Sequence, residues 1–298
     1  MAAFFRQLAA DIRSALFELK ADSRQIVRYV LSTESHVYAF AIAANVLLSF
    51  WPFMLVLIAL LRNVLGWPAA VSALYATIQD YFAGATGEFL TYNLETITQW
   101  RRQVEWLSML LLLFTANGIF LPLEVALNRA WGVSENRNLL KNQIVSMGLI
   151  FACGILALFS AALTGAGVQV WEAFFGQAGT SAPWAIKLIA KAASLPVTVL
   201  VLFLIYIYLP NTAVPRRAIL PRVIVVGLFL ELLKWINLAI WPWLFRKFDR
   251  EFGVFKHSVT ILTWSFLAAM VVLAGAEWIA WRARQQSGEK PIESPGQP

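Results

Sequence analysis

The sequence has little of what most enzymes use for chemistry. Its 298 residues include one cysteine, Cys153, and two histidines, His36 and His257, and only 14% are charged. A single thiol forms neither an intramolecular disulfide nor a cysteine cluster for a metal. The sequence also has no HExxH zinc motif, no GxSxG nucleophile elbow and no GxxxxGK[ST] phosphate loop. These absences argue against an enzyme, and we predict no metal, cofactor or nucleotide.

Apolar residues, in contrast, are abundant. Hydrophobic side chains make up 59% of the chain, which includes 13 tryptophans, and the mean hydropathy is +0.66. A soluble domain of this size cannot bury so much apolar surface, so the predicted fold class is an all-α polytopic membrane protein. In such a protein a net charge of +7 indicates cytoplasmic loops facing anionic lipid rather than nucleic acid.

One apolar run, residues 223–244 (VIVVGLFLELLKWINLAIWPWL), organises the rest of the prediction. A helix of this length crosses a hydrocarbon core of ~30 Å. Glu231 and Lys234 lie near its middle, where a charge facing lipid costs roughly 2.5 kcal/mol or more. Gly227 and Asn237 share their helical face at spacings of four and three residues. We therefore expect this face to point into the helix bundle.

Hydropathy predicts six spans, with a helical outer segment at 62–104 inside a membrane domain of 36–281. The spans are 36–61, 105–131, 144–171, 185–209, 223–244 and 257–281. Residues 1–35 are predicted to form an amphipathic helix on the membrane surface, and 282–298 a disordered tail. Lys and Arg are denser on the side that holds both termini, which predicts that both are cytoplasmic.

Further polar residues fall inside the predicted spans. Glu124 lies in the second span, on one helical face with two asparagines, and is a candidate partner for Lys234. The predicted substrate path consists of Asn117, Glu124, Asn128, Glu231, Lys234, Asn237 and Glu277. Intramembrane polar residues mark a substrate or ion path, or else they form hydrogen bonds and ion pairs that fix helix packing. The sequence leaves both interpretations open.

Four cations crowd the short loop predicted between the last two spans: Arg246, Lys247, Arg250 and Lys256. In one interpretation they form an outer cationic rim that meets lipid phosphates. In the other, Asp249 and Glu251 offset half of the charge, and the loop is an ordinary mixed-charge surface.

Several short segments together resemble the YihY/BrkB family of bacterial inner-membrane proteins, once labelled ribonuclease BN. The residues that carry the resemblance are Trp131, Pro210, Asn211, Gly253, Trp264 and Gly275. Phe252 departs from the tyrosine that the family commonly has before this glycine. The resemblance implies a bacterial inner-membrane location, roles in envelope integrity, serum resistance or virulence, and movement of lipid-like material. It also implies that the ribonuclease label is a misassignment.

These observations lead to a functional prediction. We expect a non-enzymatic transporter or facilitator of lipid or lipid-linked substrates, whose partners are membrane lipids and not nucleic acid. In this hypothesis Lys234 contacts an anionic head group, Glu231 and Glu124 tune its charge, and Asn128 and Asn237 supply hydrogen bonds. The alternative is a structural or scaffolding membrane protein, and a ribonuclease is the less favoured one. The oligomeric state is left open.

Overall fold

The computed structural model describes residues 2–64, 66–82, 84–98, 119–133, 137–138, 140–156 and 194–287. Within these ranges the regular structure is helical and no strand occurs, which confirms the all-α class predicted from hydropathy. Asn117, parts of the predicted second, third and fourth spans, and residues 288–298 of the predicted tail lie outside the described residues. The number of six spans therefore stays a prediction. Residues 282–287, predicted as the start of the disordered tail, are helical.

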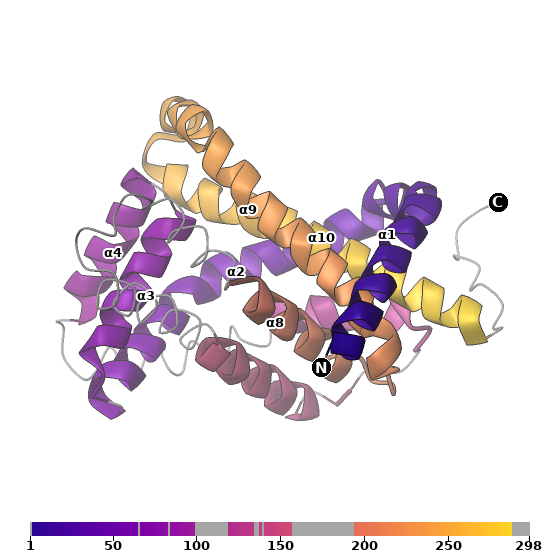
Figure 1. The fold of residues 1–298 in the computed structure, drawn as a ribbon. Coiled ribbons are helices and arrows are strands. Elements are labelled where there is room, and N and C mark those ends of the chain that lie inside the picture. Colours follow the sequence, from indigo (N-terminus) through magenta and orange to yellow (C-terminus); the bar gives the residue numbers. More distant parts are fainter. Residues whose placement is uncertain are drawn as a thin grey trace.

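In the described part of the chain three helices are long and apolar enough to cross a membrane: α2 (Thr33–Ala59), α9 (Arg216–Phe252) and α10 (Lys256–Ser287). The central helix is α10, which packs against both α2 and α9 (Figure 1). At ~1.5 Å per residue the 37 residues of α9 extend to about 55 Å. Because a hydrocarbon core is ~30 Å thick, α9 continues well beyond it.

The predicted loop between the last two spans is mostly helix. Helix α9 continues to Phe252, and only the short 3₁₀ turn η3 (Gly253–Phe255) separates it from α10. Gly253 permits this reversal because its φ of +50° lies in the left-handed region that other residues rarely adopt. The loop prediction was wrong because polar residues continue a helix readily once it has left the membrane.

Shorter helices complete the bundle. Helix α8 (Ser194–Tyr208) packs along α9, and two further apolar helices cover 119–130 and Leu140–Leu156. At one end of the molecule, α3 (Pro68–Tyr81) and α4 (Ala85–Thr98) pack against each other beyond the π-helical turn η1 (Leu60–Val64) (Figure 1). These two helices and the second half of α2 form a separate apolar core.

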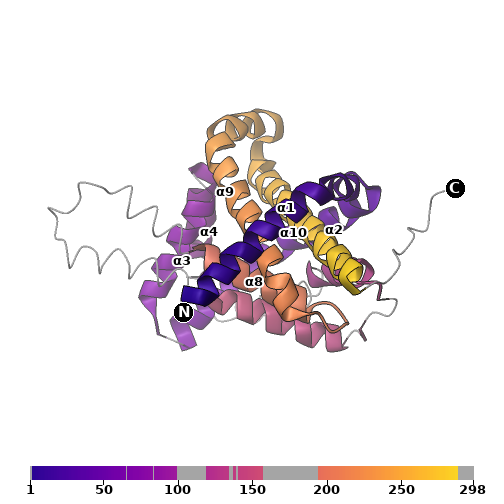
Figure 2. The same ribbon diagram turned by 45° about the vertical axis from the view of Figure 1, so that its right-hand side comes forward.

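Helix α1 (Ala2–Val30) does not run with the others. It crosses over α9 and α10 near the end of the bundle that carries the last described residues of α10 (Figure 2). Only Leu31 and Ser32 separate it from α2. An amphipathic helix that lies across the ends of apolar helices fits the predicted surface helix in position.

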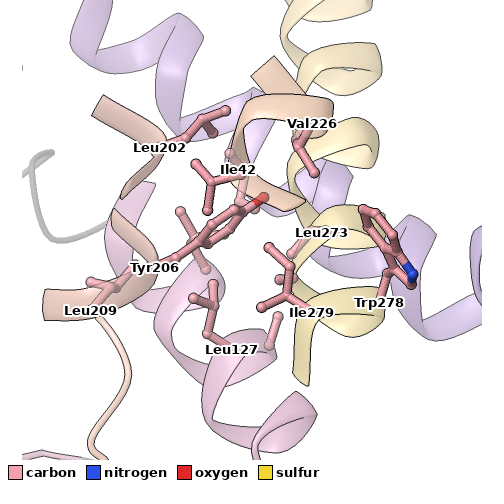
Figure 3. Close-up of a cluster of buried hydrophobic side chains, with 14 of the residues drawn as sticks. Ile42, Leu127, Leu202, Tyr206, Leu209, Val226, Leu273, Trp278 and Ile279 are labelled. Carbon is pink, nitrogen blue, oxygen red and sulfur yellow. The ribbon is translucent and has the colours of Figure 1, made fainter. Parts of the chain in front are cut away.

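The main core surrounds Tyr206 of α8 (Figure 3). Its side chain is 1% exposed and its hydroxyl donates a 2.7 Å hydrogen bond to the carbonyl of Val272 on α10. Gly275 brings α10 against α9 here, because a Cβ at this position would lie 2.6 Å from a methyl group of Val226. Side chains from α2, α8, α9, α10 and helix 119–130 meet at this point: Ile42, Leu127, Leu202, Leu209, Val226, Leu273 and Ile279.

Candidate functional site

The predicted path residues that the structure describes fall into two groups with different surroundings. The first group lies in the middle of α9: Glu231, Lys234 and Asn237. The second belongs to other helices, in the half of the molecule that α1 crosses: Glu124, Asn128 and Glu277.

The first group contains an ion pair within one helix. The Lys234 ammonium lies 3.0 Å from Oε2 of Glu231, three residues earlier on α9. The other carboxylate oxygen, Oε1, accepts a 3.1 Å hydrogen bond from the Thr198 hydroxyl on α8. The side chains of Lys234 and Glu231 remain 14% and 13% exposed. The pair is therefore held in place without being sealed in the core.

Close approach of α8 explains how Thr198 reaches the pair. A Cβ at Gly227 would lie 2.8 Å from a methyl group of Val199, so the glycine lets the two helices touch one turn before Glu231. The face that the sequence predicted to point inward thus does contact a neighbouring helix.

The second group begins with Glu124, which is only 1% exposed. Its Oε1 accepts a long hydrogen bond, 3.5 Å, from the backbone N–H of Arg137. The predicted pairing of Glu124 with Lys234 is wrong, because the cation that acts on the Glu124 carboxylate is Arg137, and Lys234 pairs with Glu231 in its own helix. Asn128, one turn after Glu124, lies close to the same carboxylate.

Arg137 and Asn128 together bind the end of α8. The Arg137 guanidinium donates to the carbonyls of Leu209 and Pro210 at 3.0 and 2.9 Å. The Asn128 side-chain oxygen accepts a 2.7 Å hydrogen bond from the backbone N–H of Asn211. These bonds hold the backbone just beyond the end of α8. Sequence reasoning missed this role of Arg137, because a residue in a loop carries no periodic signal.

Glu277 lies among other charged groups at the end of the bundle. Its carboxylate is 3.7 Å from the guanidinium of Arg284, and the Glu34–Arg129 ion pair acts on it as well. Burial raises the pKa of Tyr29 on α1, and the negative charge of Glu277 raises it further. Glu277, which the sequence places at the end of the sixth span, thus has α1 among its neighbours, and its place in a substrate path stays a prediction.

The predicted outer cations gather where α9 turns into α10. Lys256 pairs with Asp249 at 2.5 Å and lies over the ring of Phe245, 5.1 Å from its centroid. Arg246 and Arg250 are exposed on the last turns of α9 and donate to backbone carbonyls of the same helix. Lys247, also on α9, lies 5.7 Å over the ring of Trp243. The mixed-charge interpretation describes Lys256, whereas Arg246 and Arg250 still present cations outward.

The residues of the family resemblance lie mainly at turns and close contacts. Trp131 follows helix 119–130, Pro210 and Asn211 follow α8, Gly253 forms the α9–α10 turn, and Gly275 lies at the α9–α10 contact. The indole nitrogen of Trp264 on α10 is buried and makes no hydrogen bond within the described part of the chain. Among the described residues no cluster of three His, Cys, Asp or Glu side chains is suited to a metal ion.

Long apolar helices, a surface helix and a charged pair in mid-helix define an all-α membrane protein. The sequence profile described as virulence factor BrkB matches residues 26–297. The chain belongs to this family, which confirms the resemblance drawn from its motifs.

Curated relatives carry the same general description. The chain is 28% identical to a "UPF0761 membrane protein" of Chromohalobacter salexigens, an alignment that covers 84% of this chain and 60% of that protein. A protein of the same name from Azotobacter vinelandii is 24% identical over 87% of this chain and 63% of its own length. The chain thus spans about three fifths of the length of these relatives. No solved structure matches significantly.

Proposed function

We propose that this protein facilitates the movement of lipid or lipid-linked substrates in the bacterial inner membrane, where both of its termini face the cytoplasm. The family description, virulence factor, supports a role at the cell envelope and names no reaction. The observation that carries the proposal is the Glu231–Lys234 pair, which lies halfway along an apolar helix with both side chains still partly exposed.

The energetics favour a use for these charges. Each one costs roughly 2.5–3.5 kcal/mol at the centre of a bilayer, and pairing offsets only part of that cost. An ion pair between Glu231 and Lys234 is therefore a weak way to stabilise α9. Transient binding of an anionic head group by Lys234, with Glu231 beside it, would give the two charges a function.

The geometry suits an amphiphile. The Lys234 ammonium has three donors, so it can bind a phosphate oxygen while Thr198 continues to hold Glu231 through its hydroxyl. Leu228 and Trp235, one turn before and after Glu231, are 41% and 44% exposed. A head group at Lys234 would thus keep its acyl chains against an apolar surface of the same helix.

The test is lipid movement in proteoliposomes containing a fluorescent phosphatidylglycerol or phosphatidylcholine. We expect wild-type protein to move the labelled lipid between leaflets and Lys234→Met to abolish this movement. Lys141→Met is the control, because it removes an exposed lysine that belongs to neither the predicted path nor the predicted rim, and it is expected to retain activity. Movement by Lys234→Met at the wild-type rate, or none by wild type with either lipid, would contradict the proposal.

A scaffolding function is the second candidate, and the contacts of Arg137 with the chain after α8 favour it. The bonds from Arg137 and Asn128 to the end of α8 look like a permanent connection rather than a binding site. The double variant Glu231→Leu/Lys234→Met separates the two candidates. A substrate-binding pair predicts a protein that keeps its thermal stability but moves no lipid, whereas a structural pair predicts a measurable loss of stability.

A further inference from the structure

Helix α1 separates its charges by sign. All three of its acidic residues turn toward the bundle: Glu18 pairs with Arg222 of α9 at 2.9 Å, and Asp22 pairs with Arg282 of α10. Asp11, together with Glu18, lines a hollow of about 320 Å³ between α1 and α9. The acidic charge of α1 is therefore directed at its own bundle.

The opposite side of α1 is basic and apolar. Every Lys and Arg of the helix is exposed, and none forms an ion pair with another described residue: Arg6, Arg13, Lys20, Arg24 and Arg28. Spacings of seven and four residues keep them on one side of the helix. Phe17 and Leu31 lie among them and are 70% and 73% exposed. We call this side the outward face of α1; it is defined by these seven residues, of which Leu31 directly follows the helix.

The position of α1 places this face at the edge of the membrane. Two ion pairs attach α1 to the bundle. One is with Arg222, directly before the predicted span 223–244 in α9, and the other is with Arg282, directly after the predicted span 257–281 in α10. Its last turn leads directly into α2 through Leu31 and Ser32. Figure 2 shows α1 lying across α9 and α10. Because Glu18 and Asp22 turn toward these helices, the basic residues on the opposite side of α1 point away from them. Phosphate head groups and the first acyl carbons lie at this depth.

We propose that the outward face of α1 binds the anionic lipid surface of the membrane. Basic side chains fit lipid phosphates, and Phe17 and Leu31 fit the apolar region just below them. Nucleic acid is the other polyanion that a basic helix attracts, but it offers no acyl chains to these two exposed side chains. The inference is independent of lipid transport, because the face lies on α1 and not on the middle of α9.

The experiment uses a fluorophore attached to the full-length protein at one position. Because Cys153 is the only cysteine in the sequence, Cys153→Ser with Ala21→Cys gives one labelling site, next to the outward face. The protein is placed in phosphatidylcholine vesicles that contain equal fractions of either brominated phosphatidylglycerol or brominated phosphatidylcholine. We expect stronger quenching by the brominated phosphatidylglycerol, because anionic lipid collects around α1.

Neutralising the face is expected to remove this preference. Each basic residue near an anionic surface contributes up to about fivefold to lipid binding, so Arg13→Gln/Lys20→Gln/Arg24→Gln/Arg28→Gln should lower the ratio of the two quenching constants to near unity. The matched control, Arg246→Gln/Lys247→Gln/Arg250→Gln at the far end of α9, should leave the ratio unchanged. In the protein with an intact outward face, added salt should lower the ratio of the two quenching constants, since exposed charges are screened beyond a Debye length of ~10 Å at 0.1 M.

Three results overturn the inference. The first is equal quenching by the two brominated lipids in the protein with an intact outward face. The second is a loss of the preference for phosphatidylglycerol in the control variant as large as in the neutralised one. The third is a ratio of quenching constants that does not change with salt. A labelled protein that shows no lipid preference but binds a single-stranded RNA oligonucleotide through the four mutated residues would reassign the face to nucleic acid.

Discussion

Replacing Gly275 by alanine tests a tight contact of α10 with α9 and α8. A Cβ at this position would lie 2.6 and 2.8 Å from the two methyl carbons of Val226 and 2.8 Å from the Tyr206 hydroxyl. Separations this short force the neighbours to move. Tyr206 has little freedom to do so, because it is 1% exposed and its hydroxyl is bonded to the Val272 carbonyl.

The size of the effect follows from these contacts. Overpacking a well-packed core costs typically 1–3 kcal/mol, and weakening the Tyr206 hydrogen bond adds about 1 kcal/mol. Alanine returns up to about 1 kcal/mol through its higher helix propensity. We therefore expect Gly275→Ala to lower the free energy of unfolding by roughly 1–3 kcal/mol.

The assay is reversible unfolding in mixed micelles with increasing dodecyl sulfate, followed by tryptophan fluorescence. Gly148→Ala is the control, because Gly148 is exposed and no atom lies within 4 Å of a Cβ built there. Adding Val226→Ala to Gly275→Ala should recover part of the loss, which a double-mutant cycle measures. Equal stability of the two alanine variants, or a coupling energy near zero between positions 275 and 226, would refute this account of the contact.

Three further substitutions test contacts that join separate helices. Asn128→Ala removes the acceptor for the Asn211 N–H; we expect a loss of about 1–3 kcal/mol and faster hydrogen exchange at that amide. Asp22→Asn breaks the ion pair with Arg282; a loss of ~3 kcal/mol is expected, with more protease cleavage within α1. His257→Ala removes a 2.9 Å hydrogen bond to Thr86 and the ring that stacks on Phe89 of α4. Hydrogen exchange should therefore rise in α4 and not in α8. An unchanged exchange rate or cleavage pattern would contradict each expectation.

Hydropathy was sufficient to predict the class of the fold, and amphipathic spacing to predict a helix near the start of the chain. The helix ends were not predictable in the same way. Residues 245–252 read as a loop because they are charged, yet charged residues continue a helix outside a membrane when nothing breaks it, and the first break is Gly253. Hydropathy marks where a helix leaves the membrane and does not mark where the helix stops.

The candidate site was predicted in part. Spacing placed Glu231 and Lys234 on one face, and the structure pairs them. The same reasoning could not identify partners on other helices, so Glu124 was assigned to Lys234 and the role of Arg137 was missed. Periodicity describes one helix at a time, whereas a partner on another helix depends on how the helices are packed.

The distinction between contacts within and between helices also bears on function. The ion pair of Asp22 and Arg282 joins two helices, so its loss loosens their attachment. The ion pair of Glu231 and Lys234 lies within α9 and does not by itself hold α9 against a neighbour; the hydroxyl of Thr198 supplies a link to α8. A locking role would therefore be lost with Thr198→Val, which removes this link, as readily as with Lys234→Met. A head-group site predicts instead that lipid movement depends on Lys234 far more than on Thr198, and the two variants compared in one proteoliposome assay distinguish these mechanisms.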